Sequence, residues 1–590
     1  LREEWGFDGA VVTDWGGSND HALGVKNGST LEMPAPGGDA VRELLAAVRS
    51  GKITEADVDD RLDELLTLVL DTHAAVERHS RSFDADAHHA LARRAAGESV
   101  VLLKNDDALL PLAEGTRVAV IGDFAETPRY QGAGSSAVNS IKVDTFLDCL
   151  SDSGLHSVGF APGFDRQGKP DAAKQAEAVA LAAKADAVLL CLGLDEIKES
   201  EGLDRADMKL ADNQIELLQA VREANPNTVV IVNAGASLET PWLAHCKALV
   251  YGALGGQAGA GAMVDVLTGK INPGGKLAET WANAYADTPA RDHFAGPGRT
   301  VQYREGLYVG YRYYQTAGVP VAFPFGHGLS YTQFAYSDLH ADAHSATLTV
   351  TNTGDRAGAE IVQLYVAKPN AEIFRPAQEL KAFAKVQLAA GESKTVTLTL
   401  DDKAFRYRNT RTDSWEVEGG TYELRVGASS ADIRLTAAVE VIGTDALNPY
   451  AGKALPHYQS GKVQTVPDAE WETLLGRPIP DDRVKIDRNM TLGELNHGRS
   501  PLGWLVWAVL TALLNASYKK GKPDLNVLFQ YNMPLRALAK MTNGAISMGM
   551  VDGIVMEVQG FWVIGLVRVI FEAVKNVILN AQLENRLRNS

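Results

Sequence analysis

"DAVLLCLG", from Asp186 to Gly193, is the stretch of sequence that decides the fold. An apolar run of this length, ended by a glycine, is typical of a strand buried on both faces of a parallel sheet. Similar runs recur, and amphipathic helical patterns separate them. The further strands are predicted at 117–123, 228–235 and 247–255, and the helices at 171–185 and 212–225. This alternation predicts an α/β domain over residues 99–290.

The pattern changes on both sides of this domain. Residues 76–98 form an Ala-rich polar linker with some predicted helix, and residues 291–320 form a connector rich in Tyr and Arg. From 321 to 442, segments such as "ATLTVTNTG" (346–354) and "TYELRVG" (421–427) alternate with period two. Alternation of this kind, with turn signals between the segments, predicts a β-sandwich.

Residues 1–75 have the pattern of the end of an α/β unit. A short strand is predicted over Gly9–Thr13, followed by a helix with apolar residues at 41, 44, 45 and 48. Thr54 and Asp57 form a capping-box pattern at the start of a second helix. One strand and two helices cannot bury a core alone, so we expect them to belong to a larger unit.

Residues 443–590 are predicted to be helical. "PLGWLVWAVLTALL" (501–514) is too short to span a bilayer. The longer apolar stretch over 558–579 contains Arg568, Glu572 and Lys575. We expect a helical appendage packed on the protein, with a membrane-surface or partner contact as the alternative.

The composition excludes several classes of partner. The net charge of −17 argues against nucleic acid and anionic membrane, and is compatible with a neutral ligand such as a sugar. The three cysteines (Cys149, Cys191 and Cys246) are too few and too scattered for a disulfide framework, so free thiols are expected. His88 and His89 lie on a predicted helix and are interpreted as solvated; no zinc-ligand spacing is present, and no metal or cofactor is expected. "GAGSS" lacks the spacing of a nucleotide-binding loop.

Two acidic features are candidates for chemistry. "VVTDWGGSND" (11–20) places Asp14 after a predicted strand, with the flat apolar face of Trp15 beside it; an ordinary turn is the alternative. The loop 193–210 contains three Glu and three Asp, and a solvated acidic loop is its alternative reading. Two carboxyl groups on either side of one bond are what glycoside hydrolysis requires.

Several motifs, in order along the chain, resemble glycoside hydrolase family 3, the β-glucosidase-like enzymes. They cover residues 1 to about 440 and are "LREEWGFDGAVVTDWGG", "LEMP", "ESEGLDR", "INPGGKLAETW", "LYVGYRYY", "FPFGHGLSYT", "ELKAFAKVQLAAGESKTV" and "YELRVGASSADI". Residues 443–590 resemble an appendage of some actinobacterial members. A bacterial source is therefore expected, and a cytoplasmic location is slightly favoured.

The resemblance implies a role for each candidate residue. Asp14 would be the nucleophile and Glu201 the general acid/base, with Glu199 as the rival for the second role. Trp15 would form part of the sugar subsite, and Arg205 would order the acid/base loop by pairing with Asp204 or Glu199. The segment "RYQGAGSS" (129–136) matches a loop near the family's pocket, with a plain turn as the alternative, and His327 would be structural.

The implied fold is multidomain α/β plus all-β. It comprises the C-terminal end of a (β/α)8 barrel (1–75), a linker (76–98), an α/β sandwich domain (99–290), a connector (291–320), a fibronectin type III-like domain (321–442) and a helical C-terminal region (443–590). The rest of the barrel, with the groups that grip sugar hydroxyls, has no match in this chain. The chain is therefore expected to be a fragment with little activity alone.

The implied activity is that of a retaining exo-β-glycosidase acting on a β-glucoside or oligosaccharide, with β-glucosidase first. β-Xylosidase, α-L-arabinofuranosidase and exo-β-glucanase are alternatives within the family, and an N-acetylglucosaminidase is disfavoured because the "ESEGLDR" segment is present. A non-catalytic carbohydrate-binding module would fit the β-sandwich, but would leave Asp14 and Glu201 unexplained. A homo-oligomer stays open.

Overall fold

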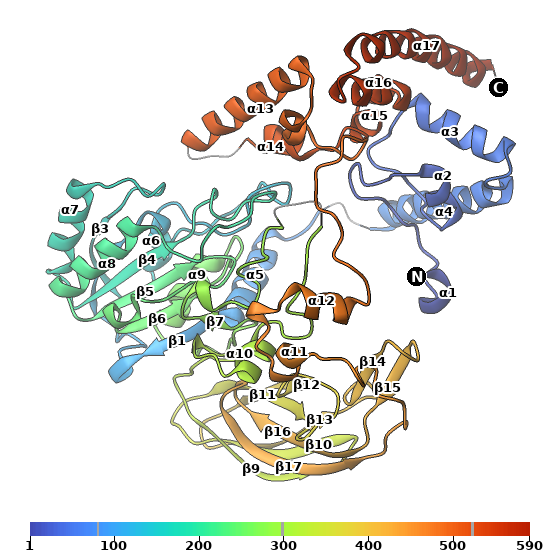
Figure 1. Ribbon diagram of the computed structural model, residues 1–590. Coiled ribbons are helices and arrows are strands. Elements are labelled where there is room, and N and C mark those ends of the chain that lie inside the picture. Colours follow the sequence, from blue (N-terminus) through green and yellow to red (C-terminus); the bar gives the residue numbers. More distant parts are fainter. Residues whose placement is uncertain (80–81, 297–299, 521–523, 590) are drawn as a thin grey trace. The chain divides into compact units, whose positions relative to one another are not determined.

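The computed structural model describes residues 1–79, 82–296, 300–520 and 524–589 (Figure 1). The chain divides into two compact units. One consists of the two ends of the chain, residues 1–84 and 482–590, and the other of residues 85–481. We call them the terminal unit and the central unit.

The central unit begins with a six-stranded sheet of order β1-β6-β5-β4-β2-β3. Its strands are β1 (Val101–Asn105), β2 (Arg117–Ile121), β3 (His156–Ala161), β4 (Ala187–Gly193), β5 (Thr228–Asn233) and β6 (Ala248–Tyr251). All neighbouring pairs are parallel except β1 with β6. Every residue of β4 is buried, as the apolar run that opened the sequence predicts.

Helices pack around this sheet in two contacting groups. The helix α7 (Ala172–Ala182) packs on α8 (Asp212–Ala224), while α5 (Ala85–Ser99) and α6 (Phe146–Leu150) both pack on α9 (Gly259–Leu267). The α/β architecture predicted from the alternation of strands and helices is therefore confirmed.

A β-sandwich follows in the same unit. Three strands form one sheet in the order β13-β10-β9, and four form the other in the order β12-β11-β16-β17. The bounds are β9 (Phe334–Ala341), β10 (Ser345–Asn352), β11 (Gly358–Ala367), β12 (Glu379–Leu388), β13 (Ser393–Thr399), β16 (Gly420–Gly427) and β17 (Ile433–Val441), with a hairpin of β14 (Arg406–Asn409) and β15 (Ser414–Val417). In β10 every second residue is buried, so the predicted alternation is confirmed.

The connector and the first part of the C-terminal region share a separate core. Tyr308 and the helix α10 (Tyr311–Ala317) pack against α11 (Pro456–Ser460) and α12 (Asp468–Leu475). Tyr458 is fully buried and its hydroxyl donates to the Arg304 carbonyl at 2.9 Å. Two short strands on either side of the connector, β7 (Trp281–Ala282) and β8 (Val321–Phe323), form an antiparallel pair. Residues 443–481 therefore belong to the central unit.

The N-terminal part of the terminal unit contains α1 (Arg2–Trp5), α2 (His21–Lys26), α3 (Gly38–Arg49) and α4 (Glu55–Arg78). The predicted capping box is present, because Thr54 and Asp57 exchange side-chain and backbone hydrogen bonds. The strand predicted over Gly9–Thr13 is reduced to one parallel bridge, between Val12 and Leu31. A ladder extends only where an extended segment runs alongside, and the described residues give this segment a single bridge to Leu31.

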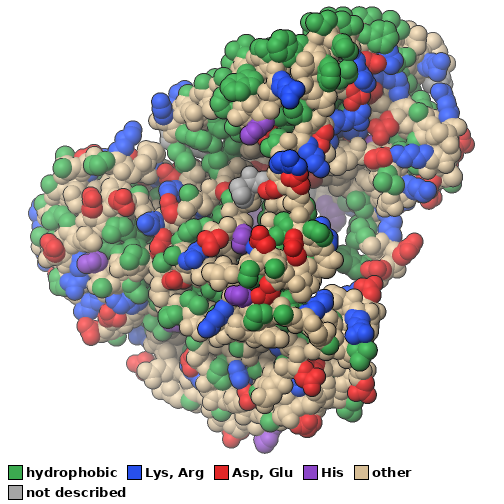
Figure 2. Space-filling model, viewed as in Figure 1, with side chains coloured by type: hydrophobic (Ala, Val, Ile, Leu, Met, Phe, Trp, Pro, Cys, Tyr) green, Lys and Arg blue, Asp and Glu red, His purple; other side chains and the backbone are tan. Residues whose placement is uncertain are grey.

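The C-terminal part of the same unit is helical. It comprises α13 (Pro501–Lys519), α14 (Leu525–Asn532), α15 (Ala537–Met541), α16 (Met548–Val558) and α17 (Trp562–Asn589). Its core includes Met490, Leu535 and Val551, which are fully buried. Figure 2 shows hydrophobic side chains gathered on the surface of these helices. The exposed large hydrophobic residues of α13 and α17 include Trp504, Leu505, Val563, Val567 and Phe571.

The first apolar stretch forms a longer helix than the sequence predicted. Helix α13 has 19 residues, because the polar residues after Leu514 continue it to Lys519. It is the one helix in the described part of the chain that is long and apolar enough to cross a membrane, with a mean hydropathy of 1.3. The prediction that this segment is too short to span a bilayer is therefore wrong. Length and composition alone, in a single helix, are weak evidence that it crosses a membrane.

One histidine departs from its predicted setting. His89 is buried, with Nε2 3.0 Å from Asp144 Oδ1 and Nδ1 2.9 Å from Gln257 Nε2, so the prediction that it is solvated is wrong. The helical pattern around it is too weakly amphipathic to reveal which side faces the α/β domain. Cys149, Cys191 and Cys246 are free, as predicted, and burial raises the pKa of the Cys191 thiol to about 12.

Candidate active site

Asp14 lies in a tight turn of the terminal unit, directly after the Val12–Leu31 bridge. Its carboxylate accepts a hydrogen bond from the Trp15 N–H at 2.6 Å, and its carbonyl accepts from Gly17 at 3.0 Å. The N–H of Gly16 donates to the Met33 carbonyl at 2.9 Å. The turn is thereby fixed to the "LEMP" segment, and the Asp14 side chain stays exposed.

The surface around Asp14 is hollowed. A broad depression of about 460 Å³ is lined by Thr13, Asp14, Gly17, Ser18, Asn19, Asp20, Leu23, Gly24, Asn27 and Ser29. The Trp15 side chain is 56% exposed and is not part of this lining. An exposed carboxylate in such a depression can act as a nucleophile or as a base toward a bound polar molecule.

Glu201 lies in the central unit, on the long loop that follows β4. Its N–H donates to the Ala133 carbonyl at 2.9 Å, and Ser200 forms a parallel bridge with Ala133. The carboxylate oxygen Oε2 accepts from the Ser135 N–H at 2.5 Å. Hydrogen bonding from Ser135 holds the pKa of Glu201 below its usual range. The "RYQGAGSS" segment thus contacts the candidate acid/base directly, which favours the functional interpretation of that segment over a plain turn.

Glu199 has a different environment from Glu201. Its carboxylate lies 2.6 Å from the guanidinium of the buried Arg129 and accepts the Gly235 N–H at 2.9 Å. Arg129 also donates to the Leu194 carbonyl at 2.7 Å and to the Glu199 carbonyl at 3.1 Å. These bonds fix both the start and the middle of the acid/base loop. The Glu199 carboxylate is therefore engaged in ordering the loop, through a buried guanidinium and a backbone N–H.

Arg205 does not have the partner that the sequence suggested. The partner of Glu199 is Arg129, whereas the Arg205 guanidinium donates to the Ser237 carbonyl at 3.5 Å. Arg129 is the first residue of "RYQGAGSS", and no pattern in the sequence indicates that it contacts a loop 70 residues away.

A third carboxyl group near this loop, that of Glu279, was not identified from the sequence. Glu279, in the "INPGGKLAETW" segment, accepts the Ser237 hydroxyl at 3.2 Å. Partial burial of its carboxyl group raises the pKa of Glu279, and the negative charge of Glu199 acts in the same direction. A raised pKa is the property that a general acid needs, so Glu279 is a structural rival to Glu201.

The hydrogen bond from Ser135 leads to a prediction about Gly134. A Cβ atom on Gly134 would lie 2.5 Å from both Cβ and Oε2 of Glu201, and the backbone φ of +132° disfavours any L side chain. We expect Gly134→Ala to displace the Glu201 carboxylate and to lower turnover of substrates with poor leaving groups at least about tenfold. Steady-state kinetics measures this effect.

Gly132→Ala is the matched control, because its nearest neighbour would be the Ser136 hydroxyl at 3.4 Å. Equal activity of the two variants would contradict the assigned role of the loop.

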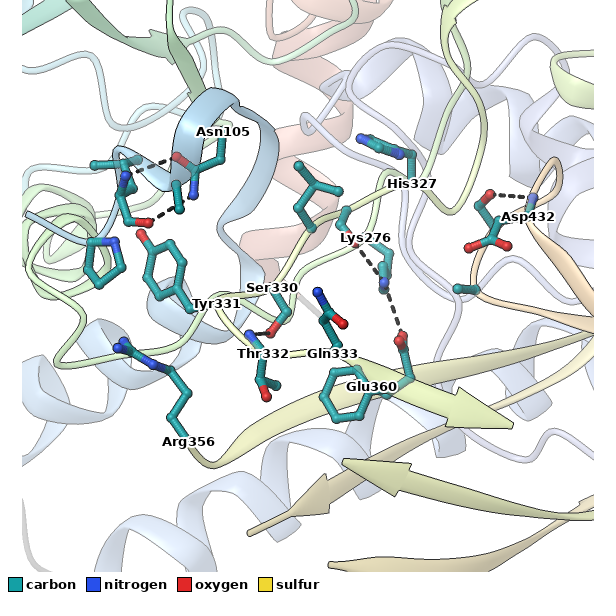
Figure 3. A pocket seen from close by; sticks show the side chains of 18 of the residues that line it. Asn105, Lys276, His327, Ser330, Tyr331, Thr332, Gln333, Arg356, Glu360 and Asp432 are labelled. Carbon is teal, nitrogen blue, oxygen red and sulfur yellow. Dashed lines mark hydrogen bonds and ion pairs between the residues drawn. The ribbon is translucent and has the colours of Figure 1, made fainter. Parts of the chain in front are cut away.

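A separate cavity of about 890 Å³ lies between the α/β domain and the β-sandwich (Figure 3). Lys276 points toward Glu360 there, with Nζ 3.0 Å from the carboxylate and 2.8 Å from the Gly328 carbonyl. Its lining contains neither Glu201 nor Glu199. The charged residues that line it form ion pairs with one another: Lys276 with Glu360, Arg356 with Asp355, and Arg434 with Asp432. We therefore interpret this cavity as a junction between the two domains.

Metal ligation has no geometric support in the described ranges. No group of three or more His, Cys, Asp or Glu side chains stands close enough there to hold an ion.

Comparison with known proteins identifies the domains. The glycosyl hydrolase family 3 C-terminal domain matches residues 100–331, and the fibronectin type III-like domain matches residues 360–430. An exo-alpha-(1->6)-L-arabinopyranosidase from Bifidobacterium breve is 43% identical over 465 residues, which are 76% of this chain and 61% of that protein. Thermostable beta-glucosidase B from Acetivibrio thermocellus is 42% identical over 75% of this chain and 60% of its own length. The chain thus spans about 60% of the length of these relatives.

Solved structures give the same result. The GH3 beta-glucosidase of Bifidobacterium adolescentis is 42% identical, with a TM-score of 0.72, over 79% of this chain and 69% of that one. The beta-glucosidase of Kluyveromyces marxianus in complex with glucose is 28% identical, with a TM-score of 0.70, over 75% and 74% of the two chains. With these matches across the α/β domain and the β-sandwich, the chain belongs to glycosyl hydrolase family 3.

Proposed function

We propose that the protein containing this chain is a retaining, exo-acting β-glycosidase that removes terminal β-D-glucosyl residues. Asp14 is the nucleophile that forms the glycosyl-enzyme, and Glu201 protonates the leaving oxygen and later activates water. Trp15 forms part of the sugar subsite, and Arg129, with Glu199, orders the acid/base loop. Residues 1–75 are, in this proposal, the C-terminal end of a (β/α)8 barrel, whose strand ends are the usual place for catalytic groups.

The setting of Glu201 is the observation on which this proposal rests most. It is an exposed carboxylate whose backbone and side chain are both held by residues 133–135, while its rival Glu199 is committed to Arg129. A retaining glycosidase uses two carboxyl groups about 5–5.5 Å apart, one as nucleophile and one as acid/base. Several structural relatives are named as beta-glucosidases, and three of them were solved in complex with glucose.

A pentopyranoside is the second candidate substrate. The relatives with 43% identity include exo-alpha-(1->6)-L-arabinopyranosidases, so the same site in this protein can be adapted to a sugar without the exocyclic hydroxymethyl group. Discrimination by one small group in a pocket is worth about 1–3 kcal/mol, which makes moderate activity on both sugars an ordinary outcome.

The test is hydrolysis of nitrophenyl glycosides by the whole protein. We expect β-D-glucoside to have the highest kcat/KM, with α-L-arabinopyranoside and β-D-xyloside within roughly 10- to 200-fold of it. Proton NMR of the first product should show the β-anomer, because double displacement retains configuration. An α-anomer as the first product from the β-glucoside would contradict the mechanism, and a higher kcat/KM for the arabinopyranoside would transfer the assignment to the second candidate.

A further inference from the structure

The C-terminal helices are joined to residues 1–84 by a buried charge. Lys540, in α15, is 5% exposed, and its Nζ lies 3.5 Å from Glu32 Oε1 and 3.3 Å from Glu43 Oε2. His21 Nδ1 lies 2.7 Å from the other carboxylate oxygen of Glu32. A buried ammonium group is tolerated only where its partners stay in place, so this contact specifies one arrangement of the two segments.

A second contact lies at the start of α3. A Cβ atom on Gly37 would lie 2.5 Å from the backbone carbonyl carbon of Asn543, so the two segments approach as closely as only glycine allows. Next to it, the Asp39 carboxylate accepts the N–H of Met548 at 3.1 Å. The Arg42 guanidinium donates to Asn576 at 2.7 Å. The two ends of the chain thus meet through paired polar groups and close backbone packing.

The contact reaches the turn that contains Asp14. Met541 follows Lys540, and its sulfur lies 3.1 Å from where a Cβ atom of Gly16 would be. On the other side of that turn, the Met33 N–H donates to the Thr13 hydroxyl at 2.9 Å. Lys540 therefore holds the "LEMP" segment through Glu32, while Met541 contacts the turn 14–17 at Gly16.

We propose that Lys540 and Met541 are positioning residues for the nucleophile, so that the C-terminal helices are a structural part of the active site. This inference rests on the proposed function, because it takes Asp14 as the nucleophile. The domains matched by comparison end at residue 430 and assign nothing to these helices. Without the Met541 side chain the turn loses its packing contact at Gly16, and Asp14 samples a wider range of positions.

The test measures covalent labelling of Asp14 in the whole protein. A 2-deoxy-2-fluoro-β-glucoside with a dinitrophenolate leaving group traps the glycosyl-enzyme, and mass spectrometry locates the label. We expect Met541→Ala to lower the maximal labelling rate by about 10- to 100-fold, with the half-saturating inactivator concentration unchanged, because displacement of the reacting group costs rate and not binding. Met541→Leu, which conserves volume, should restore most of the rate.

Hydrogen exchange in the 590-residue chain is the second readout. We expect faster exchange of the Gly16 and Gly17 amides in Met541→Ala and in Lys540→Met, because the turn opens more often. Met556→Ala is the control, since the Met556 sulfur contacts Arg568 within the C-terminal helices. It should leave exchange at Gly16 unchanged.

The outcomes separate the two proposals. If the unsubstituted protein forms no label on Asp14, the proposed function is wrong. If Asp14 is labelled, but Met541→Ala is labelled at the normal rate and exchanges normally at Gly16, the positioning role is wrong while the proposed function stands. A loss in Met541→Ala that Met541→Leu does not restore would also contradict the role.

Discussion

Replacing Asp14 with alanine in the whole protein should lower turnover of an aryl β-glucoside by about 10⁴-fold or more, because no glycosyl-enzyme can form without the nucleophile. The loss should fall on kcat for activated and unactivated substrates alike, since both need the covalent step. Steady-state kinetics with 4-nitrophenyl β-glucoside measures it. Asp8→Ala, at an exposed aspartate six residues earlier, is the control and should keep normal activity.

Rescue of the Asp14→Ala variant by azide is a second test of this prediction. In Asp14→Ala the missing carboxylate leaves space on that face of the sugar, where a small anion can attack once. We expect azide to restore turnover of dinitrophenyl β-glucoside and to give the α-glucosyl azide, the product of a single inversion. Asp14→Ala with near-normal activity, or rescue that gives a β-product, would remove Asp14 from the nucleophile role.

Replacing Glu201 with alanine should have an effect that depends on the leaving group. An alkyl glucoside needs protonation of its departing oxygen, so its turnover should fall by about 10²- to 10⁴-fold. Dinitrophenolate leaves without a proton, so the first step with that substrate should change little. Comparison of kcat/KM across a series of leaving-group pKa values measures the difference, and Glu201→Ala should show a steeper dependence than the unsubstituted protein.

Glu199→Gln and Glu279→Gln are the comparisons that make this prediction sharp. Glu199 holds Arg129, so its substitution should disturb the whole loop and lower turnover of all substrates by a similar factor. Glu279 has the raised pKa of a proton donor. If Glu279→Gln, and not Glu201→Ala, steepens the dependence on leaving group, then Glu279 is the acid.

Predictions from the sequence were most accurate where a structure depends on residues close together in the chain. The buried strand β4 follows from a run of apolar residues, and β10 follows from strict alternation, because the order of side chains along a strand indicates which of its faces are buried. The capping box at Thr54 was predictable for the same reason, since its two partners are three residues apart.

The sequence was silent where the partner lies far along the chain. Glu199 and Arg129 are 70 residues apart, and nothing in the composition of either segment distinguishes Arg129 from Arg205 as the partner. Lys540 and Glu43 are 497 residues apart. The predicted strand Gly9–Thr13 shows the converse, because an apolar run forms a strand only when a neighbouring strand is available.

The contact with Arg129 also shows why Glu201 and Glu199 could be told apart only in the structure. Glu199 and Glu201 are two residues apart in one acidic loop, and residue type gives no ground for choosing between them. The structure distinguishes them by environment, a buried guanidinium for one and backbone amide contacts in an exposed position for the other. Such differences in environment assign distinct roles to chemically identical groups.

The division of the chain into units has a consequence for biosynthesis. The central unit of about 400 residues is inserted between the two parts of the terminal unit. At about 5–20 residues per second, the ribosome takes roughly 20–80 s to synthesise the insertion after Asp14 has emerged. The nascent Asp14 turn waits through that interval, and through synthesis of residues 482–540, before Met541 is made. A stalled or prematurely terminated chain would therefore release the N-terminal segment with its packing partner unmade.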